Sequence, residues 1–395
     1  MMRSNHFQFL LTACLGLLLA GCNTTQVRTT EHTGIIQEST PIAEHLLLDV
    51  GIGIFNPGVD PDADPEKTGI FPKIRAAEAR FMPYILMETL QQSGNWGMVR
   101  VIPDRQSEMD VWVDAEILVS DGATLELGVT VQDSSGRTWF TKKYQEEASK
   151  YAFDPSIPNH GEPFQGLYNR IANDLLAYHR SLPEAEIVAI RTITGLQFAR
   201  RFAPEVFTGH LTADEQGRLY IARTPAPNDP VLQRVEQIRE RDYMFVDTLQ
   251  EYYESFVRQM DVPYLEWRKA FYEESEALRE ARAQRNARLI GGAVAILGGI
   301  LAQGSNSPVV NTAGQVGIFG GAAAIYSGLH KREEVKFHVE SLEQISDSLQ
   351  GEMEPHTMAL EDKTVTLSGS VNEQYRQWRE ILREMYESET GLTTN

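Results

Sequence analysis

The chain of 395 residues contains only two cysteines, Cys14 and Cys22. Two cysteines cannot build a disulfide framework or a cysteine-rich zinc site. The nine histidines are scattered and form no His-Glu-x-x-His pair, so the sequence predicts no metal ligands. It also lacks a Gly-x-Ser-x-Gly elbow, a phosphate-binding glycine loop and a dinucleotide fingerprint. We therefore predict a protein without enzymatic activity, catalytic residues, metal or cofactor.

Positive charge is scarce as well. Lys and Arg number 36 against 55 Asp and Glu, which gives a formal net charge of -19. Such a balance disfavours binding to nucleic acid or to anionic lipid head groups. The apolar leader over residues 7–19 follows Arg3 and is too short to cross the ~30 Å of a bilayer as a helix. This combination is typical of a secretory signal peptide.

The leader ends in Leu19, Ala20, Gly21 and Cys22. This tetrad resembles the lipobox of bacterial lipoproteins. The resemblance implies that cleavage follows Gly21 and that the thiol of Cys22, the new amino-terminal residue, carries lipid. Asn23 stands where an aspartate signals inner-membrane retention in lipoproteins of enteric type, so the resemblance implies the periplasmic face of the outer membrane. The alternative is an ordinary secretory signal followed by an unmodified cysteine.

The pattern over residues 45–182 predicts the order strand, helix, four strands, helix. Apolar residues alternate over 46–55, which predicts a strand, and recur at helical spacing over 72–93, with Pro83 as a kink or a start. Three alternating runs over 111–144, separated by turn residues, predict an antiparallel meander. We expect an α+β protein with an amino-terminal α/β layer, helices on one sheet face and the other face available for a neighbour.

Several of these segments also carry a resemblance to a known family. They are the strand around Gly51 and Gly53, the helix after it, the strand over 99–102 and the hairpin Val131-Gln132-Asp133-Ser134-Ser135-Gly136. Together they are similar to the small periplasmic α/β domains of the curli-secretion lipoproteins and of the Tol system's amino-terminal domain. The resemblance implies an envelope protein that forms rings or complexes without catalysis. The long amphipathic β-hairpins of a curli pore are missing, so a pore is not expected.

The second half is predicted to be mainly helical. We expect a small hairpin from 206–212 and 218–223, and then a long helix that Pro263 interrupts. Amphipathic stems follow on either side of residues 289–330, which contain no Asp, Glu, Lys or Arg. We predict a long antiparallel helical hairpin with this apolar segment as its tip. Its small residues, which would allow close helix packing, are Gly291, Ala295, Gly299, Ala302, Ala313, Gly317, Gly321, Ala324 and Gly328.

These patterns divide the chain into successive segments. The expected segments are a signal peptide over 1–21, a flexible linker over 22–41, an α/β domain over 42–182, a mixed helical and hairpin region over 183–263, the helical hairpin over 264–350 with its tip at 289–330, and a small hairpin plus terminal helix over 351–395.

The apolar tip has two possible environments. It forms a buried helical pair, inside a core or between subunits, or it enters a membrane with Arg285, Arg288, Lys331 and Arg332 at head-group level. The predicted function is that of a non-enzymatic outer-membrane lipoprotein that assembles with itself, or inserts the hairpin, in envelope assembly, transport or secretion. The alternatives are a monomeric periplasmic scaffold that binds another envelope protein, and a cell-wall hydrolase, for which no nucleophile or metal set is found.

Overall fold

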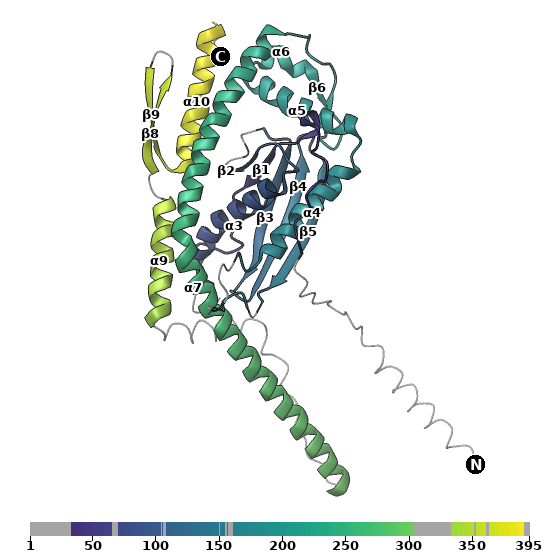
Figure 1. Cartoon of the computed structure of the whole chain (residues 1–395), viewed down its shortest axis with the longest axis vertical. Helices are drawn as coiled ribbons and strands as arrows, with labels where there is room; N and C mark the ends of the chain where they lie inside the picture. Colours follow the sequence, from purple (N-terminus) through teal and green to yellow (C-terminus); the bar gives the residue numbers. More distant parts are fainter. Residues whose placement is uncertain are drawn as a thin grey trace, which may run out of the picture. The chain divides into compact units, whose positions relative to one another are not determined.

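A mixed five-stranded sheet and a set of helices make up the fold, which confirms the predicted α+β class (Figure 1). The structure is a computed structural model. It describes residues 33–64, 70–103, 105, 108–149, 151–154, 156, 161–303, 333–350, 353–360 and 363–390.

The sheet has the strand order β2-β1-β3-β4-β5. Its strands are β1 (Val50–Gly53), β2 (Val99–Ile102), β3 (Val111–Ser120), β4 (Thr124–Asp133) and β5 (Thr138–Glu147). β1 pairs in parallel with β2 and β3, whereas β3, β4 and β5 pair antiparallel. In β4 every second residue from Leu125 to Val131 is buried and the residues between them are half-buried. This alternation means that one face of the sheet packs on the core.

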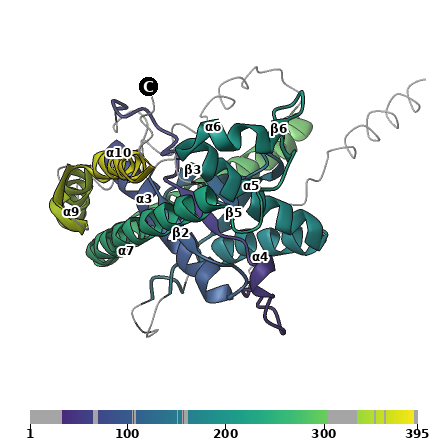
Figure 2. The ribbon, with the colours of Figure 1, turned by 90° about the horizontal axis from the view of Figure 1, so that it is seen from above.

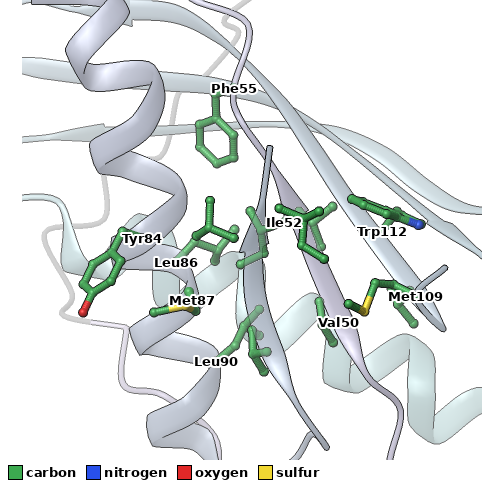
Figure 3. Close-up of a cluster of buried hydrophobic side chains, with 14 of the residues drawn as sticks. Val50, Ile52, Phe55, Tyr84, Leu86, Met87, Leu90, Met109 and Trp112 are labelled. Carbon is green, nitrogen blue, oxygen red and sulfur yellow. The ribbon is translucent and has the colours of Figure 1, made fainter. Parts of the chain in front are cut away.

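Helices α3 (Pro72–Ser93) and α4 (Gln165–Ser181) contact each other, and they reach β1, β2 and β5 (Figure 1). Pro72 lies in the first turn of α3, and the helix ends just before Gly94, whose φ of 67° is left-handed. Figure 3 shows Leu86 and Leu90 of α3 in one cluster of buried hydrophobic side chains with Ile52 and Val50 of β1. The opposite sheet face carries polar side chains such as exposed Glu116 and Lys143.

β1 is shorter than predicted. The alternation over 46–55 predicts one continuous strand, but a 3-10 helix occupies Glu44–Leu46 and only Val50–Gly53 is strand. The glycines of β1 allow a close approach of its neighbours: a Cβ at Gly51 would lie 2.8 Å from Met109 Cγ, and one at Gly53 would lie 2.9 Å from Asp114 Oδ1. Packing against Met109 before β3 and against Asp114 of β3, rather than strand propensity, explains the two glycines.

Of the remaining elements, only η1 (Glu44–Leu46) precedes β1 in the described residues. The elements after the sheet and α4 are α5 (Glu184–Phe202), α6 (Pro204–Phe207), η2 (Thr208–His210), β6 (Leu211–Ala213), β7 (Leu219–Ile221), α7 (Pro230–Gln303), α9 (Glu333–Gln350), β8 (Met353–Leu360), β9 (Lys363–Gly369) and α10 (Val371–Thr390). Figure 2 shows α9 and α10 beside α7, on the side away from α4.

The predicted interruption at Pro263 is wrong, because α7 passes through this proline as one helix. A proline inside a helix removes one backbone hydrogen bond and costs ~3 kcal/mol or more. Met260, Tyr264 and Trp267 on either side of it are buried. We infer that tertiary packing of both flanks offsets the cost of the proline.

The predicted strand over 206–212 is also largely wrong. Pro204 opens the short helix α6, and η2 follows directly, so the strand β6 begins only at Leu211. Proline is favoured in the first turn of a helix, where its missing N–H is not needed. Phe207 and His210 are buried, which holds this turn against the body.

The expected flexible linker over 22–41 needs a correction at residues 33–38, while residues 22–32 lie outside the described residues. Residues 33–38 form hydrogen bonds to asparagine side chains of α4 and of the loop that follows α3, and the Gln37 side chain donates to the Gln92 carbonyl of α3. Polar composition suggested flexibility, but the backbone of an extended segment carries donors and acceptors that polar side chains of the body can satisfy.

A buried carboxylate joins the start of β3 to two other segments. Asp110 Oδ2 accepts the N–H of Asp49 at 2.9 Å, and its Oδ1 lies 2.6 Å from the hydroxyl of Thr194 on α5. Burial raises the pKa of Asp110 to about 6, although these hydrogen bonds act in the opposite direction. The charged form is therefore costly at neutral pH.

We expect Asp110→Asn to stabilise the protein relative to wild type as the pH rises. Because the folded pKa lies above the unfolded one, Asp110 lowers stability above pH 6, and protonation relieves this cost as the pH falls towards 4. An asparagine amide can donate to the Thr194 hydroxyl, which then donates to the Ile190 carbonyl at 3.0 Å. We expect urea unfolding to show that the free energy of unfolding of the variant, relative to wild type, is on the order of 2 kcal/mol larger at pH 7 than at pH 4.5. A constant difference between the two proteins would contradict this assignment.

Candidate functional site: the root of the glycine-rich helix

α7 carries the described part of the predicted contact site. Gly291, Ala295, Gly299 and Ala302 all belong to its last turns before Gln303. Cys22, Asn23 and the second stripe lie outside the described residues. That second stripe comprises Ala313, Gly317, Gly321, Ala324 and Gly328.

The first contact of α7 is with the edge strand β2. The Gln250 side chain accepts the N–H of Val101 at 2.9 Å and donates to the Val101 carbonyl at 2.9 Å. One amide thus takes the place of a neighbouring strand and leaves this position of the edge paired. Beside it, Arg100 Nε and Asp247 Oδ1 form an ion pair at 2.6 Å.

We expect Gln250→Leu to lower the free energy of unfolding by about 1–3 kcal/mol, because both backbone groups of Val101 lose their partner. The matched control is Gln259→Leu on the same helix. Gln259 is exposed and its amide reaches only the Ser255 hydroxyl, at 3.4 Å. Urea denaturation of both variants measures the difference, and equal losses would show that the edge contact contributes little.

The second contact is a buried network around Glu78 of α3. Its Oε1 accepts the Tyr264 hydroxyl of α7 and the Ser120 hydroxyl of β3, both at 2.7 Å. Its Oε2 lies 3.0 Å from Arg75 Nε, and Arg75 also donates to the carbonyl of Ile117 at 3.3 Å. Burial raises the pKa of Glu78, while Arg75 and the two hydroxyls oppose that shift. Helix α3, strand β3 and helix α7 therefore meet at one carboxylate.

The third contact pairs Arg268 of α7 with Glu162, just before α4. Both side chains are buried, and the two guanidinium nitrogens lie 2.6 and 3.1 Å from the carboxylate oxygens. The Tyr264 ring lies 4.1 Å from the guanidinium carbon, close enough for a cation–π contact. Burial lowers the pKa of Arg268, but Glu162 and Tyr264 together hold it above its ordinary value. Arg268 therefore stays charged at this junction.

The fourth contact holds the terminal helix α10 against α7. Arg379 of α10 lies 2.8 Å from Asp242 of α7 and 3.7 Å from Glu108, which also pairs with Arg201 of α5 at 2.5 Å. The guanidinium of Arg379 stands over the Phe198 ring at 5.3 Å. Burial raises the pKa of Glu108, and the two arginines act against that shift.

α9 packs against both α3 and α7. Its Leu342 is buried, and Asp347 forms an ion pair with Lys73 of α3 at 2.8 Å. α9, which follows α7 in the chain, therefore packs against α7 itself and against α3.

A cavity of about 330 Å³ lies between α3, α7 and the segment before α4. Its walls include Glu88, Thr89, Arg258, Asp261 and Arg268. The Thr89 hydroxyl in this wall donates to the carbonyl of Ile85 at 2.7 Å. Within the described ranges, no group of three His, Cys, Asp or Glu side chains could hold a metal ion.

No family model matches the chain, and no curated protein or solved structure matches it. The lipobox and the likeness to curli-secretion lipoproteins stay predictions. Among the helices in the described ranges, none has both the length and the apolar character needed to cross a membrane.

Sequence patterns did not identify the side chains that fix α7 to the rest of the fold. The spacing of Trp267 and Phe271 indicates a buried face, and both are buried. Glu78 and Tyr264 lie 186 residues apart, and their side chains look like an ordinary charged and an ordinary aromatic position of two helices. One local signal was available: Arg268 directly follows Trp267 on the inward side of the helix.

Proposed function

We propose that this protein is a non-enzymatic lipoprotein of the bacterial outer membrane that assembles with itself through its glycine-lined helical segment. Cys22 carries the lipid in this proposal, and the body stands on the periplasmic side. The assembled protein serves envelope assembly, transport or secretion.

The observation that carries the proposal is the continuity of α7 from the body into the glycine-rich segment. Four buried or half-buried contacts fix the part of α7 that lies before Ser275. Beyond these contacts α7 continues as one helix through Gly291 and Gly299. The helical period places these small residues along one stripe of the helix. Glycine costs about 1 kcal/mol relative to alanine in a helix, so a stripe of glycines indicates that another backbone packs closely there.

Length favours association over a complete membrane crossing. The apolar part of α7, residues 289–302, is about 21 Å long at 1.5 Å per residue, against a hydrocarbon core of ~30 Å. We further propose that α7 and α9 are the legs of a helical hairpin, whose tip includes residues outside the described ranges.

Mass photometry of the lipidated protein in detergent tests the proposal. We expect a discrete large species for wild type and a monomer for Ala295→Leu, because a leucine in the stripe prevents close backbone approach. Ala293→Leu is the matched control: position 293 lies on the opposite side of the helix, about 160° from position 295. The control should keep the large species.

A monomeric wild type would overturn self-assembly and favour the monomeric scaffold. Insertion has a separate readout. If liposomes protect a cysteine introduced by Ser305→Cys from an impermeant thiol reagent while the protein remains monomeric, membrane insertion replaces self-assembly as the function of this segment.

A further inference from the structure

A set of asparagines on the body holds the segment that follows the predicted lipid attachment site. Asn95 lies just after α3, and Asn169 and Asn173 lie on α4. Asn169 Nδ2 donates to the Thr33 carbonyl at 2.7 Å, and Asn173 Nδ2 donates to the Gly34 carbonyl at 2.9 Å. We call residues 33–38 the strap.

Both backbone groups of one strap residue are paired with side-chain amides. The Ile36 N–H donates to Asn173 Oδ1 at 2.8 Å, and the Ile36 carbonyl accepts from Asn95 Nδ2 at 2.8 Å. Asn95 Oδ1 also accepts the N–H of Glu38 at 3.0 Å. A side-chain amide has the same donor and acceptor as a peptide bond, so this surface recognises extended backbone in the way a neighbouring strand would.

The asparagines that bind the strap belong to the folded body, whereas the strap lies on its surface. Asn95 and Asn169 are 2% and 5% exposed, whereas Ile36 is 42% exposed. Few strap side chains are buried, although Ile35 packs partly against the core and Glu38 pairs with Arg180 at 2.5 Å. Segments that are held by polar contacts at the surface and bury few apolar side chains open at low free energy.

We propose that these asparagines form a binding site for extended polypeptide backbone, occupied by the chain's own strap, and that the bound strap sets the length of the membrane tether. The tether length rests on the proposed lipid at Cys22, while the binding site itself does not. With the strap bound, about 11 residues separate Cys22 from the body, at most roughly 38 Å of extended chain. With the strap released, the next fixed residue is Glu44, whose carbonyl accepts from Arg191. The spacer then has about 22 residues and reaches at most roughly 75 Å.

The first experiment uses the mature chain without lipid. Ile36→Pro removes the N–H that Asn173 accepts, whereas Ile36→Ala keeps it and changes only an exposed side chain. We expect hydrogen exchange in peptides that cover residues 33–38 to be roughly tenfold faster in Ile36→Pro than in wild type, and Ile36→Ala to exchange within about twofold of wild type. Neither change touches the buried asparagines, so the body should stay folded.

The second experiment measures the tether without relying on cellular lipidation. A chain that begins at Cys22 has this residue as its single cysteine, so a maleimide lipid attaches it at that position. Neutron reflectometry on a supported bilayer then gives the separation of body and membrane. We expect this separation to be about 1.4-fold larger for Ile36→Pro than for Ile36→Ala, because the end-to-end distance of a chain without fixed structure grows as the square root of its number of residues.

The outcomes separate the two proposals. Unprotected strap peptides in wild type, or equal exchange in the two variants, would overturn the backbone-binding site. Faster exchange in Ile36→Pro with an unchanged separation would overturn its control of tether length. If Cys22 proves unlipidated in cells while both differences are observed, the envelope proposal fails and the peptide-binding site stands.

Discussion

Glu78→Leu should lower the free energy of unfolding by about 3–5 kcal/mol, the typical result of leaving a buried charge without its partner. Glu78 is 1% exposed and Arg75 is 4% exposed, and their side chains lie 3.0 Å apart. The substitution also removes the acceptor of the Tyr264 and Ser120 hydroxyls. Urea or thermal unfolding at neutral pH gives the loss directly.

The matched control for this prediction is Glu88→Leu on the same helix. Glu88 is half-buried, lines the cavity and has no ion-pair partner among the described residues, and burial raises its pKa. We expect its replacement to change stability by less than about 1 kcal/mol in either direction. An equal loss in the free energy of unfolding for Glu78→Leu and Glu88→Leu would mean that the Glu78 network does not join α3 to α7.

Arg379→Met is the second substitution with a large expected effect, again about 3–5 kcal/mol. The side chain of Asp242 is 1% exposed and that of Glu108 is 4% exposed, and Arg379 approaches both carboxylates. Methionine fills much of the volume but supplies no charge. The loss should shrink as the pH is lowered, because burial raises the pKa of Glu108 and its protonation removes one of the buried negative charges that the variant leaves behind.

Chemical denaturation at pH 7 and pH 5 checks both parts of this prediction. Arg383→Met, an exposed arginine of the same helix, is the control and should change stability by less than about 0.5 kcal/mol. Hydrogen exchange localises the effect: peptides from α10 should lose protection before those from the sheet. A loss that does not depend on pH would point to packing on Phe198 and Phe202 instead of charge pairing.

Local pattern was informative where the signal is short-range. The mixed helical region expected over 183–263 begins with α5, Glu184–Phe202, because an extended Pro183 precedes this helix and acidic residues occupy its first turn. The strands of the sheet lie where apolar residues occupy every second position of the sequence, as in β4. In these segments the spacing of the apolar side chains and the turn residues on either side are enough to predict the secondary structure.

Pattern failed where packing decided the outcome. Pro263 has a strong intrinsic tendency to end a helix, yet buried residues on both sides keep α7 continuous. The strap was predicted to be flexible because its composition is polar, and no composition rule anticipates three asparagines from distant segments aligned along its backbone. Both cases depend on neighbours that are remote in sequence.

The α+β class, the periods of the individual helices and strands, and the charge-free stretch over 289–330 can be predicted from the sequence, since each of these follows from residues close together in the chain. Which charges meet in the interior, and whether residues 33–38 bind to the body, depends on the folded structure. Ion pairs such as Arg379 with Asp242 join residues 137 positions apart, and their energy depends on burial and on distances that exist only after the chain has folded.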